Sequence, residues 1–434
     1  MVSSQKIKTP HFVNINSKVG RNINRAIVLN SVRAHQPISR AEIAELTGLS
    51  KSTISSIVGN LLIEDLVVED PGRNQEVGRN PINLQIKKGT HFVGAIAIDV
   101  AKTELAIVDL DGTIVRRKDL KTPREDPSEF VRTCVIALNE MKSGIPGSVL
   151  KGIGAAVAGR VDARRLNVVD SSIPGWRGVE LGKFVRESAP CIDGVAIESL
   201  ANASTLAELE FGTQRIGSAN MVYLLVGDTV EAGFVIDNEI LSGSSHVAGD
   251  VGHMSIVEGG APCGCGNRGC WNAYASDAAT VARYVEAIKT RPLQATGTTI
   301  DDVLAYAENG DAAAMAALTT TAHCIGRGIV NIIKIFDPEV IVVGGSIARS
   351  WNLISPHILK TIDERGYWGR QRTTAILPTT LSGSPPLLGA AALSIRKIFS
   401  EYATPFAVCT EPAMSEVIDS TWGTEIAKTN PMDN

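Results

Sequence analysis

The residues best suited to chemistry stand close together near the middle of the chain, in the stretch GHMSIVEGGAPCGCGNRGCW at 252–271. It contains His253, Cys263, Cys265 and Cys270. Thiolate and imidazole donors suit a tetrahedral Zn²⁺ site, and the glycines between the cysteines let three sulfurs converge on one loop. Four protein ligands leave no open coordination position, so the spacing predicts a structural zinc ion rather than a catalytic one. A loop of reduced cysteines without a metal is the alternative.

The composition indicates what kind of protein must position this cluster. A length of 434 residues predicts two or three domains, and 44% apolar residues are enough for sizeable cores. Plentiful glycine and few aromatic residues favour closely packed α/β layers. No apolar run approaches membrane-spanning length, the N-terminus lacks a secretory signal, and the seven cysteines do not form a disulfide pattern. The expectation is a cytoplasmic protein with reduced thiols and no membrane contact.

The N-terminal part differs from the rest in charge. Residues 1–88 carry 12 Lys and Arg against 7 Asp and Glu, whereas the remainder carries 30 against 39. A basic part attached to an acidic body suggests a polyanionic partner, although an excess of this size is also within ordinary variation.

Capping signals in the same part predict two short helices joined by a turn. Apolar spacing favours a helix over 21–34, and Ser39 followed by Glu42 forms a capping box that opens a second helix. Gly48 supplies the positive φ of a turn, and Ser50 caps a third helix. This order is typical of a helix-turn-helix. A solvated helical hairpin is the alternative.

Short or basic side chains near the start of the third helix fit the major groove of DNA. After this helix in the sequence, strands near 67–68 and 82–86 enclose a turn, which predicts a β-wing. Arginines on the wing either enter a minor groove or contact phosphates. The predicted contacts with double-stranded operator DNA are Ser39, Arg40, Ser50, Lys51, Ser52, Thr53, Ser55, Ser56, Arg73 and Arg79.

The rest of the chain alternates strands and helices. Two apolar strands meet at a hairpin turn at Asp111-Gly112, and a helix near 126–142 and an apolar strand follow. The same order then returns, with two strands around a turn at 227–232, a helix near 311–335 and the strand PEVIVVGGSI. The repeat predicts an α/β body of two similar lobes, with ligands in the cleft between them.

Six stretches in this body together resemble the ROK family of sugar kinases and sugar-responsive repressors. They are Asp99 after its strand, SSIPGW at 171–176, IESLANASTLAE at 197–208, AGDVGHMS at 248–255, CGCGNRGC at 263–270 and IVVGGSI at 341–347. The resemblance spans residues 20–398 and implies an actin/hexokinase-like (ribonuclease H-like) body. The repressor branch, which includes xylose and N-acetylglucosamine repressors, carries an N-terminal winged helix-turn-helix. The zinc ligands of the family match all four positions of the Cys/His cluster.

Three departures from the kinase pattern imply that phosphotransfer is lost. The family's base is the Asp of Glu-Asn-Asp-Ala-Asn, and here that position is Leu200, which cannot accept a proton. The first phosphate loop, at 99–103, lacks both of its glycines. The second, at 227–233, keeps only its outer glycines and gains Asp228 and Glu231, which would repel a triphosphate. No enzymatic activity and no ATP binding are expected. A kinase with an unorthodox base is the alternative.

The same resemblance implies an effector-binding pocket with altered chemistry. Relative to the kinases, the leucine at the base position suits a ligand that lacks a hydroxyl, such as a pentose or a deoxy sugar. A pocket that has lost ligand binding is the alternative. The predicted effector-binding residues are Ser172, Ser199, Asp250, His253 and Asn272.

The sequence therefore predicts a cytoplasmic transcriptional regulator, most simply a repressor, of carbohydrate genes that binds a palindromic operator as a homodimer or a dimer of dimers. A sugar-binding protein whose N-terminal helices serve only as an interaction module is a further alternative. The expected domains are an N-terminal extension at 1–20, a winged helix-turn-helix at 21–88, a two-lobed ROK body at 91–398 and a C-terminal tail at 399–434.

Overall fold

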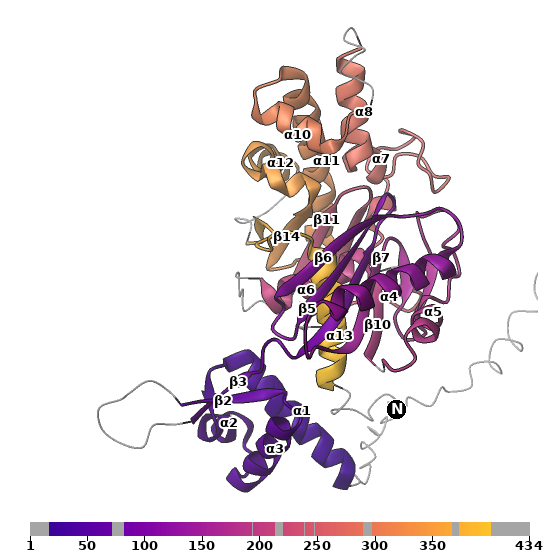
Figure 1. The fold of residues 1–434 in the computed structure, drawn as a ribbon. Coiled ribbons are helices and arrows are strands. Elements are labelled where there is room, and N and C mark those ends of the chain that lie inside the picture. Colours follow the sequence, from indigo (N-terminus) through magenta and orange to yellow (C-terminus); the bar gives the residue numbers. More distant parts are fainter. Residues whose placement is uncertain are drawn as a thin grey trace, which may run out of the picture.

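The computed structural model describes residues 17–71, 82–192, 194–212, 220–237, 239–246, 248–289, 297–366 and 373–400. Figure 1 shows an N-terminal unit beside a body of two lobes. Apolar packing is continuous from the N-terminal unit through the first lobe and onto one side of the second lobe's sheet, which includes Tyr223 and Val342. The other side of that sheet belongs to a separate core. None of the helices within the described ranges is long and apolar enough to cross a membrane.

The N-terminal unit contains three helices and a three-stranded antiparallel sheet of order β1-β3-β2. Its elements are α1 (Ser17–His35), β1 (Ile38–Ser39), α2 (Arg40–Thr47), α3 (Lys51–Ile63), β2 (Val67–Pro71) and β3 (Ile82–Ile86). The predicted capping box is present, because Ser39 Oγ accepts from the N–H of Glu42 while Glu42 Oε2 accepts from the N–H of Ser39. Gly48 has a φ of 69°, and Ser50 Oγ accepts from the N–H of Thr53.

One detail of this unit differs from the prediction, because the first helix begins at Ser17 rather than at 21. In the strand predicted at 82–86, Leu84 and Ile86 are buried, whereas Ile82 is 42% exposed. Ile82 lies at the end of β3 that leads away from the core. The predicted wing residues Arg73 and Arg79 lie outside the described residues.

The first lobe is built on a sheet of order β10-β7-β4-β5-β6, in which β4, β7 and β10 are parallel. Its elements are β4 (His91–Ile98), β5 (Lys102–Asp109), β6 (Ile114–Lys121), α4 (Pro127–Ser143), β7 (Val149–Val157), β8 (Arg160–Asp162), β9 (Asn167–Asp170), α5 (Leu181–Ser188) and β10 (Gly194–Ser199). The strand β4 is buried along its whole length, as its unbroken apolar run requires. The edge strand β6 is charged and exposed, which protects the sheet edge.

The second lobe repeats this arrangement, which confirms the predicted two-lobed α/β body. Its sheet has the order β13-β12-β11-β14-β15, with β11 antiparallel to β12 and parallel to β14. Its elements are β11 (Met221–Val226), β12 (Val230–Ile236), β13 (Glu239–Ile240), η1 (Val251–His253), α7 (Asn272–Ala275), α8 (Asp277–Ala287), α10 (Ile300–Glu308), α11 (Ala312–Phe336), β14 (Val340–Gly345), η2 (Ser346–Ser350), α12 (Trp351–Arg365) and β15 (Ala375–Pro378).

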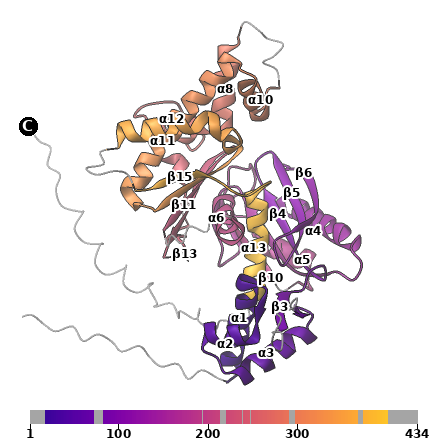
Figure 2. The ribbon, with the colours of Figure 1, turned by 90° about the vertical axis from the view of Figure 1, so that its left-hand side faces the viewer.

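Two helices, α6 (Leu200–Phe211) and α13 (Pro385–Ser400), pack against each other where the lobes meet. The helix α13 lies across β7, where Gly154 permits the approach, since a Cβ there would stand 1.7 Å from the carbonyl oxygen of Ala390. Figure 2 shows α13 running from the body to α1 of the N-terminal unit. At that end Arg33 of α1 pairs with Glu210 of α6, which also accepts from Arg396 Nε of α13 at 2.6 Å.

Candidate functional site

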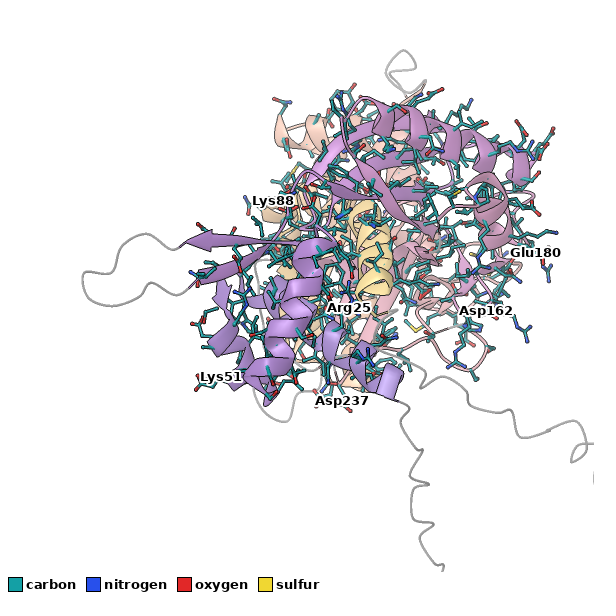
Figure 3. The ribbon with its side chains drawn as sticks, turned by 60° about the horizontal axis from the view of Figure 1, so that its bottom comes forward. Arg25, Lys51, Lys88, Asp162, Glu180 and Asp237 are labelled. Atoms are coloured by element: carbon teal, nitrogen blue, oxygen red, sulfur yellow. The ribbon has the colours of Figure 1, made fainter. Side chains whose placement is uncertain are left out.

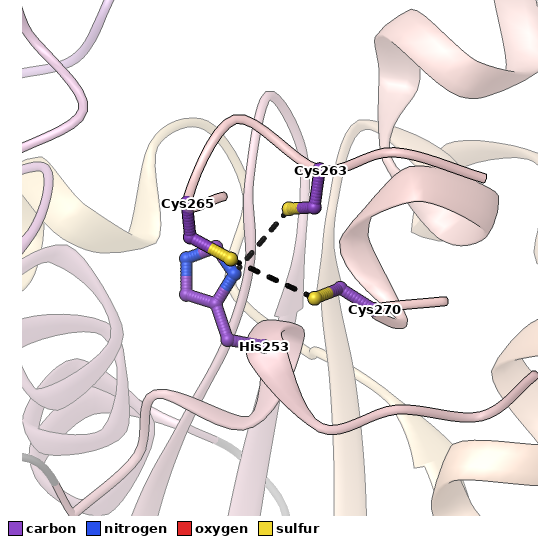
Figure 4. Close-up of side chains that lie close together, drawn as sticks. All are labelled: His253, Cys263, Cys265 and Cys270. Atoms are coloured by element: carbon purple, nitrogen blue, oxygen red, sulfur yellow. Dashed lines mark hydrogen bonds between the residues drawn. The ribbon is translucent and has the colours of Figure 1, made fainter. Parts of the chain in front are cut away.

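The four predicted metal ligands converge in the second lobe (Figure 4). Their ligand atoms all lie within 4.8 Å of one another. His253 Nδ1 lies 3.5 Å from Cys263 Sγ, and Cys265 Sγ lies 3.7 Å from Cys270 Sγ. In a tetrahedron with Zn–S bonds of about 2.3 Å, neighbouring ligand atoms lie roughly 3.8 Å apart. The cluster therefore has the donors and the spacing of a metal site.

Backbone geometry explains why the cysteine loop folds onto His253. Gly266 and Gly269 have φ values of 90° and 79°, and a Cβ at Gly269 would stand 1.7 Å from the carbonyl oxygen of Val257. The N–H of Cys263 donates to the carbonyl of Asn267 at 2.9 Å, which closes the turn.

The thiols of the cluster differ in electrostatic surroundings. A backbone N–H of Asn267 lowers the pKa of Cys265, whereas burial and the neighbouring thiols raise the pKa of Cys270 to about 12. Asp250 Oδ1 lies 3.8 Å from His253 Nε2, so a carboxylate stands behind the imidazole, as is common for metal-binding histidines.

Trp271, which follows the last cysteine, anchors the loop to the lobe's core. It is fully buried, and its indole lies against Gly328 of α11, where an added Cβ would stand 2.1 Å from Cζ2 of the indole ring. The indole occupies the space that any larger residue at that helix position would need.

We expect Gly328→Ala to displace Trp271 and to lower the free energy of unfolding by about 1–3 kcal/mol, as overpacking in a core does. Without the clash, Gly→Ala inside a helix stabilises by up to about 1 kcal/mol. Gly59→Ala in α3 is the matched control, because nothing lies within 4 Å of a Cβ there. Thermal or urea unfolding of both variants checks the prediction, and equal midpoints would contradict it.

A cavity of about 420 Å³ opens beside the cluster and is lined by residues of both lobes. Cys263 and Cys265 are part of its wall, so the metal loop shapes the cavity. The structure brings all of the predicted effector-binding residues to this cavity, namely Ser172, Ser199, Asp250, His253 and Asn272. The side-chain carbonyl of Asn272 accepts from the N–H of Val230 at 2.9 Å, which leaves the amide nitrogen of Asn272 for a ligand.

Leu200 requires a correction. It is 2% exposed and does not line the large cavity, but a second one of about 100 Å³ that Asp99 and Glu104 also line. Leu200 is the first residue of α6, whose cap Ser199 accepts from the N–H of Asn202 at 3.2 Å. The argument that a leucine wall selects a pentose or a deoxy sugar therefore has no structural support.

Sequence reasoning missed two acids that line the large cavity. Burial raises the pKa of Glu198 to about 7, and burial, followed by the charges of Asp99 and Asp250, raises that of Glu231 to about 7. Glu231 was visible in the sequence as an acid in the altered phosphate loop, but only as a group that repels a triphosphate. Glu198 was visible as the first residue of the run that matches the family's Glu-Asn-Asp-Ala-Asn, but it was given no role.

Three further acids, Asp99, Asp228 and Asp277, lie close enough for their charges to act on one another. Burial raises the pKa of Asp99 to about 6 and that of Asp277 to about 7, and it raises the pKa of Asp228 as well. Asp277 accepts from the hydroxyl of Ser346. Carboxylates clustered in this way repel the negatively charged phosphates of a nucleotide.

The exposed face of α3 carries the side chains that the sequence assigned to DNA contact. Lys51, Ser52, Ser55 and Ser56 are exposed, while the opposite face is buried in the unit's core. Lys51 lies on the outer side of the N-terminal unit in Figure 3. Asn60, one turn beyond Ser56, is exposed as well and was missed.

Four of the other predicted contacts are already engaged within the unit. The hydroxyl oxygens of Ser50 and Thr53 lie 2.9 Å apart. Arg40 pairs with Glu69 of β2 at 2.5 Å. Ser39 is 7% exposed and its hydroxyl belongs to the capping box, so the structure corrects its assignment to DNA contact. With 7% of its surface exposed, Ser39 offers little area to a ligand outside the unit.

Two lobes built on one repeated strand order around a shared cavity define an actin/hexokinase-like fold. A model of the ROK family matches residues 93–397, and the chain belongs to this family.

Relatives of two kinds resemble the chain. It is 29% identical to the xylose repressor of Bacillus spizizenii over 86% of this chain and 95% of that protein. It is 28% identical to a glucokinase of Streptomyces coelicolor over 69% of this chain and 96% of the kinase. Among solved structures, a ROK family transcriptional regulator that is a homolog of the E. coli MLC protein matches with a TM-score of 0.75 and 21% identity, over 88% of this chain and 98% of that one.

Proposed function

We propose that this chain is a sugar-responsive transcriptional repressor whose N-terminal unit is a winged helix-turn-helix. The proposal depends on one observation: the same chain contains a ROK body and the helix α3, which carries an exposed row of short polar and basic side chains. The similarity to the xylose repressor supports it, because an alignment over 86% of the chain cannot be contained in residues 93–434 and must reach into the N-terminal unit. In this proposal α3 enters the major groove and reads bases through its serines.

The body acts in this proposal as a sensor and not as a kinase. The position of the family's catalytic base is Leu200, and the acids of the cleft disfavour a nucleotide. The large cavity holds the effector, in contact with Ser172, Ser199, Asp250, His253 and Asn272. The Cys/His cluster holds a structural Zn²⁺ through His253, Cys263, Cys265 and Cys270, and this ion fixes one wall of the cavity.

The helix α6 supports coupling between the cavity and the N-terminal unit. Its cap Ser199 lines the cavity, and its other end holds Arg33 of α1 through Glu210, about 16.5 Å away at 1.5 Å per residue. Glu208 accepts from the hydroxyls of Thr379 and Thr380 at 2.6 and 2.8 Å, which ties α6 to the connection after β15 of the second lobe. A rigid helix with these three attachments transmits closure of the lobes to the DNA-binding unit.

Two copies of the chain on a palindromic operator complete the proposal, since a single winged helix buries too little surface for tight specific binding. A ligand that closes the lobes changes the relative placement of the two α3 helices and releases the DNA.

The test is selection of bound fragments from genomic DNA by the purified chain, with and without D-xylose, D-glucose and other free sugars. We expect one palindromic sequence to be enriched and one sugar to lower its affinity at least about tenfold. The absence of any enriched sequence would contradict the repressor. Sugar-dependent ATP turnover by the same preparation would instead favour the kinase.

A further inference from the structure

Two carboxylates of the large cavity have no cationic partner in the described part of the chain. Glu198 lies on β10 of the first lobe, and Glu231 lies on β12 of the second. Their hydrogen bonds come from uncharged groups: Glu198 Oε1 accepts from the N–H of Ser199 at 3.1 Å, and Glu231 Oε1 accepts from the hydroxyl of Thr229 at 2.8 Å. The side chain of Asn202 also interacts with Glu198, and the backbone of Ala201 with Glu231. One acid without a cationic partner among the described residues therefore faces the cavity from each lobe.

The cationic side chains of the cavity are each next to an acid already. Arg160 pairs with Asp170 at 2.8 Å, and both line the cavity. His246 Nε2 lies 3.6 Å from Asp162 across the lobes. The remaining histidine, His253, belongs to the metal cluster. The described residues thus offer an anionic ligand no uncommitted positive charge at this cavity.

The surroundings of these two acids strengthen the same conclusion. Burial raises the pKa of Glu198 and of Glu231 to about 7, and the charges of Asp99 and Asp250 add to the effect at Glu231. A phosphate or a second carboxylate brought into the cavity would add a like charge where water screens it poorly. Hydroxyl groups of a ligand are attracted instead, since a carboxylate accepts strong charge-assisted hydrogen bonds from them.

We propose that Glu198 and Glu231 are specificity-determining residues that bind hydroxyl groups of one ligand from opposite lobes and restrict the cavity to sugars or polyols without an anionic group. Phosphorylated sugars and sugar acids are excluded. The inference rests on the proposed function in that it takes this cavity to be the effector site. It adds a reason for closure, because a ligand held by one acid from each lobe draws the lobes together.

The test compares binding of free sugars with binding of their phosphate esters by calorimetry. The probes are D-xylose, D-xylose 5-phosphate, D-glucose and D-glucose 6-phosphate. We expect the full-length protein to bind the recognised free sugar at least about tenfold more tightly than its phosphate ester. Glu231→Gln keeps the size of the side chain and removes its charge. In this variant we expect weaker binding of the free sugar, and we expect its preference for the free sugar over the phosphate ester to fall below about threefold.

Matched variants separate this role from a general effect of charge. Glu239→Gln on the exposed strand β13 of the same sheet removes one charge outside the cavity and should leave the ratio unchanged. Glu198→Gln repeats the test from the first lobe in case Glu231→Gln does not fold. A phosphate ester that binds as tightly as its free sugar overturns the inference while leaving a sugar-responsive repressor in place. Binding of none of these probes, with operator binding intact, overturns both the inference and the sensing part of the proposed function.

Discussion

Cys270→Ser is expected to remove the metal from the protein and to destabilise the second lobe. A bound structural zinc ion contributes about 10–16 kcal/mol to the folding of small zinc units, and here it orders one loop of a larger lobe, so we expect a loss above about 3 kcal/mol. The loop between His253 and Trp271 has little regular structure to hold it otherwise, since its named elements are isolated bridges and turns. Elemental analysis should find one zinc ion per chain in the natural protein and none in the variant.

Cys191→Ser is the matched control, because Cys191 is an exposed thiol outside the cluster. It should keep both the zinc ion and the unfolding midpoint. A strong chelator should lower the midpoint of the natural protein and of this control, and should leave Cys270→Ser unchanged. Purified natural protein that contains no metal and does not respond to a chelator would contradict the zinc assignment.

Cys270→Ser also separates sugar sensing from DNA binding in the proposed repressor. Cys263 and Cys265 line the cavity, whereas the N-terminal unit packs on the first lobe, at the far ends of α6 and α13. We therefore expect Cys270→Ser to lose the response to sugar before it loses affinity for DNA. Chelated natural protein should behave in the same way.

The sequence predicted best those features whose signals are local. The four metal ligands lie within one short stretch, and the capping box of α2 is set by Ser39 and Glu42, only three residues apart. The repeated order of strands and helices likewise predicted two lobes, because each repeat can be read without knowing the other.

Side-chain direction at the cavity could not be predicted in the same way. Leu200 stands beside Ser199 in the sequence, yet the first turn of α6 directs the two side chains into different cavities. Glu231 faces the large cavity because of the pairing of β12 with β11, in which it stands opposite Leu225. Its meeting with Glu198 depends on how two separately folded lobes are placed, which no local pattern encodes.

Ser56→Glu on the exposed face of α3 is expected to weaken operator binding by about 100-fold or more, because a like charge set against DNA phosphates costs several kcal/mol. Ser56 lies one turn after Ser52 and one turn before Asn60 on that face, so the new carboxylate would stand in the middle of the predicted contact surface. Ile54 and Ile57, which hold α3 in the unit, lie on the buried side. The fold should therefore be unchanged.

Ser143→Glu at the end of α4 is the control, since it adds the same charge to an exposed helix serine of the first lobe and should leave operator affinity unchanged. Fluorescence anisotropy with a labelled operator checks both variants. Lys51→Ala tests whether Lys51 contacts a phosphate or a base. Loss of one phosphate contact lowers the slope of log affinity against log salt by about 0.9 and weakens binding to all DNA sequences alike. Loss of a base contact relaxes specificity at one position of the operator. Equal operator affinity for Ser56→Glu and Ser143→Glu would show that the operator binds to a surface other than α3. The exposed serines of α3 would then serve only to keep the unit soluble.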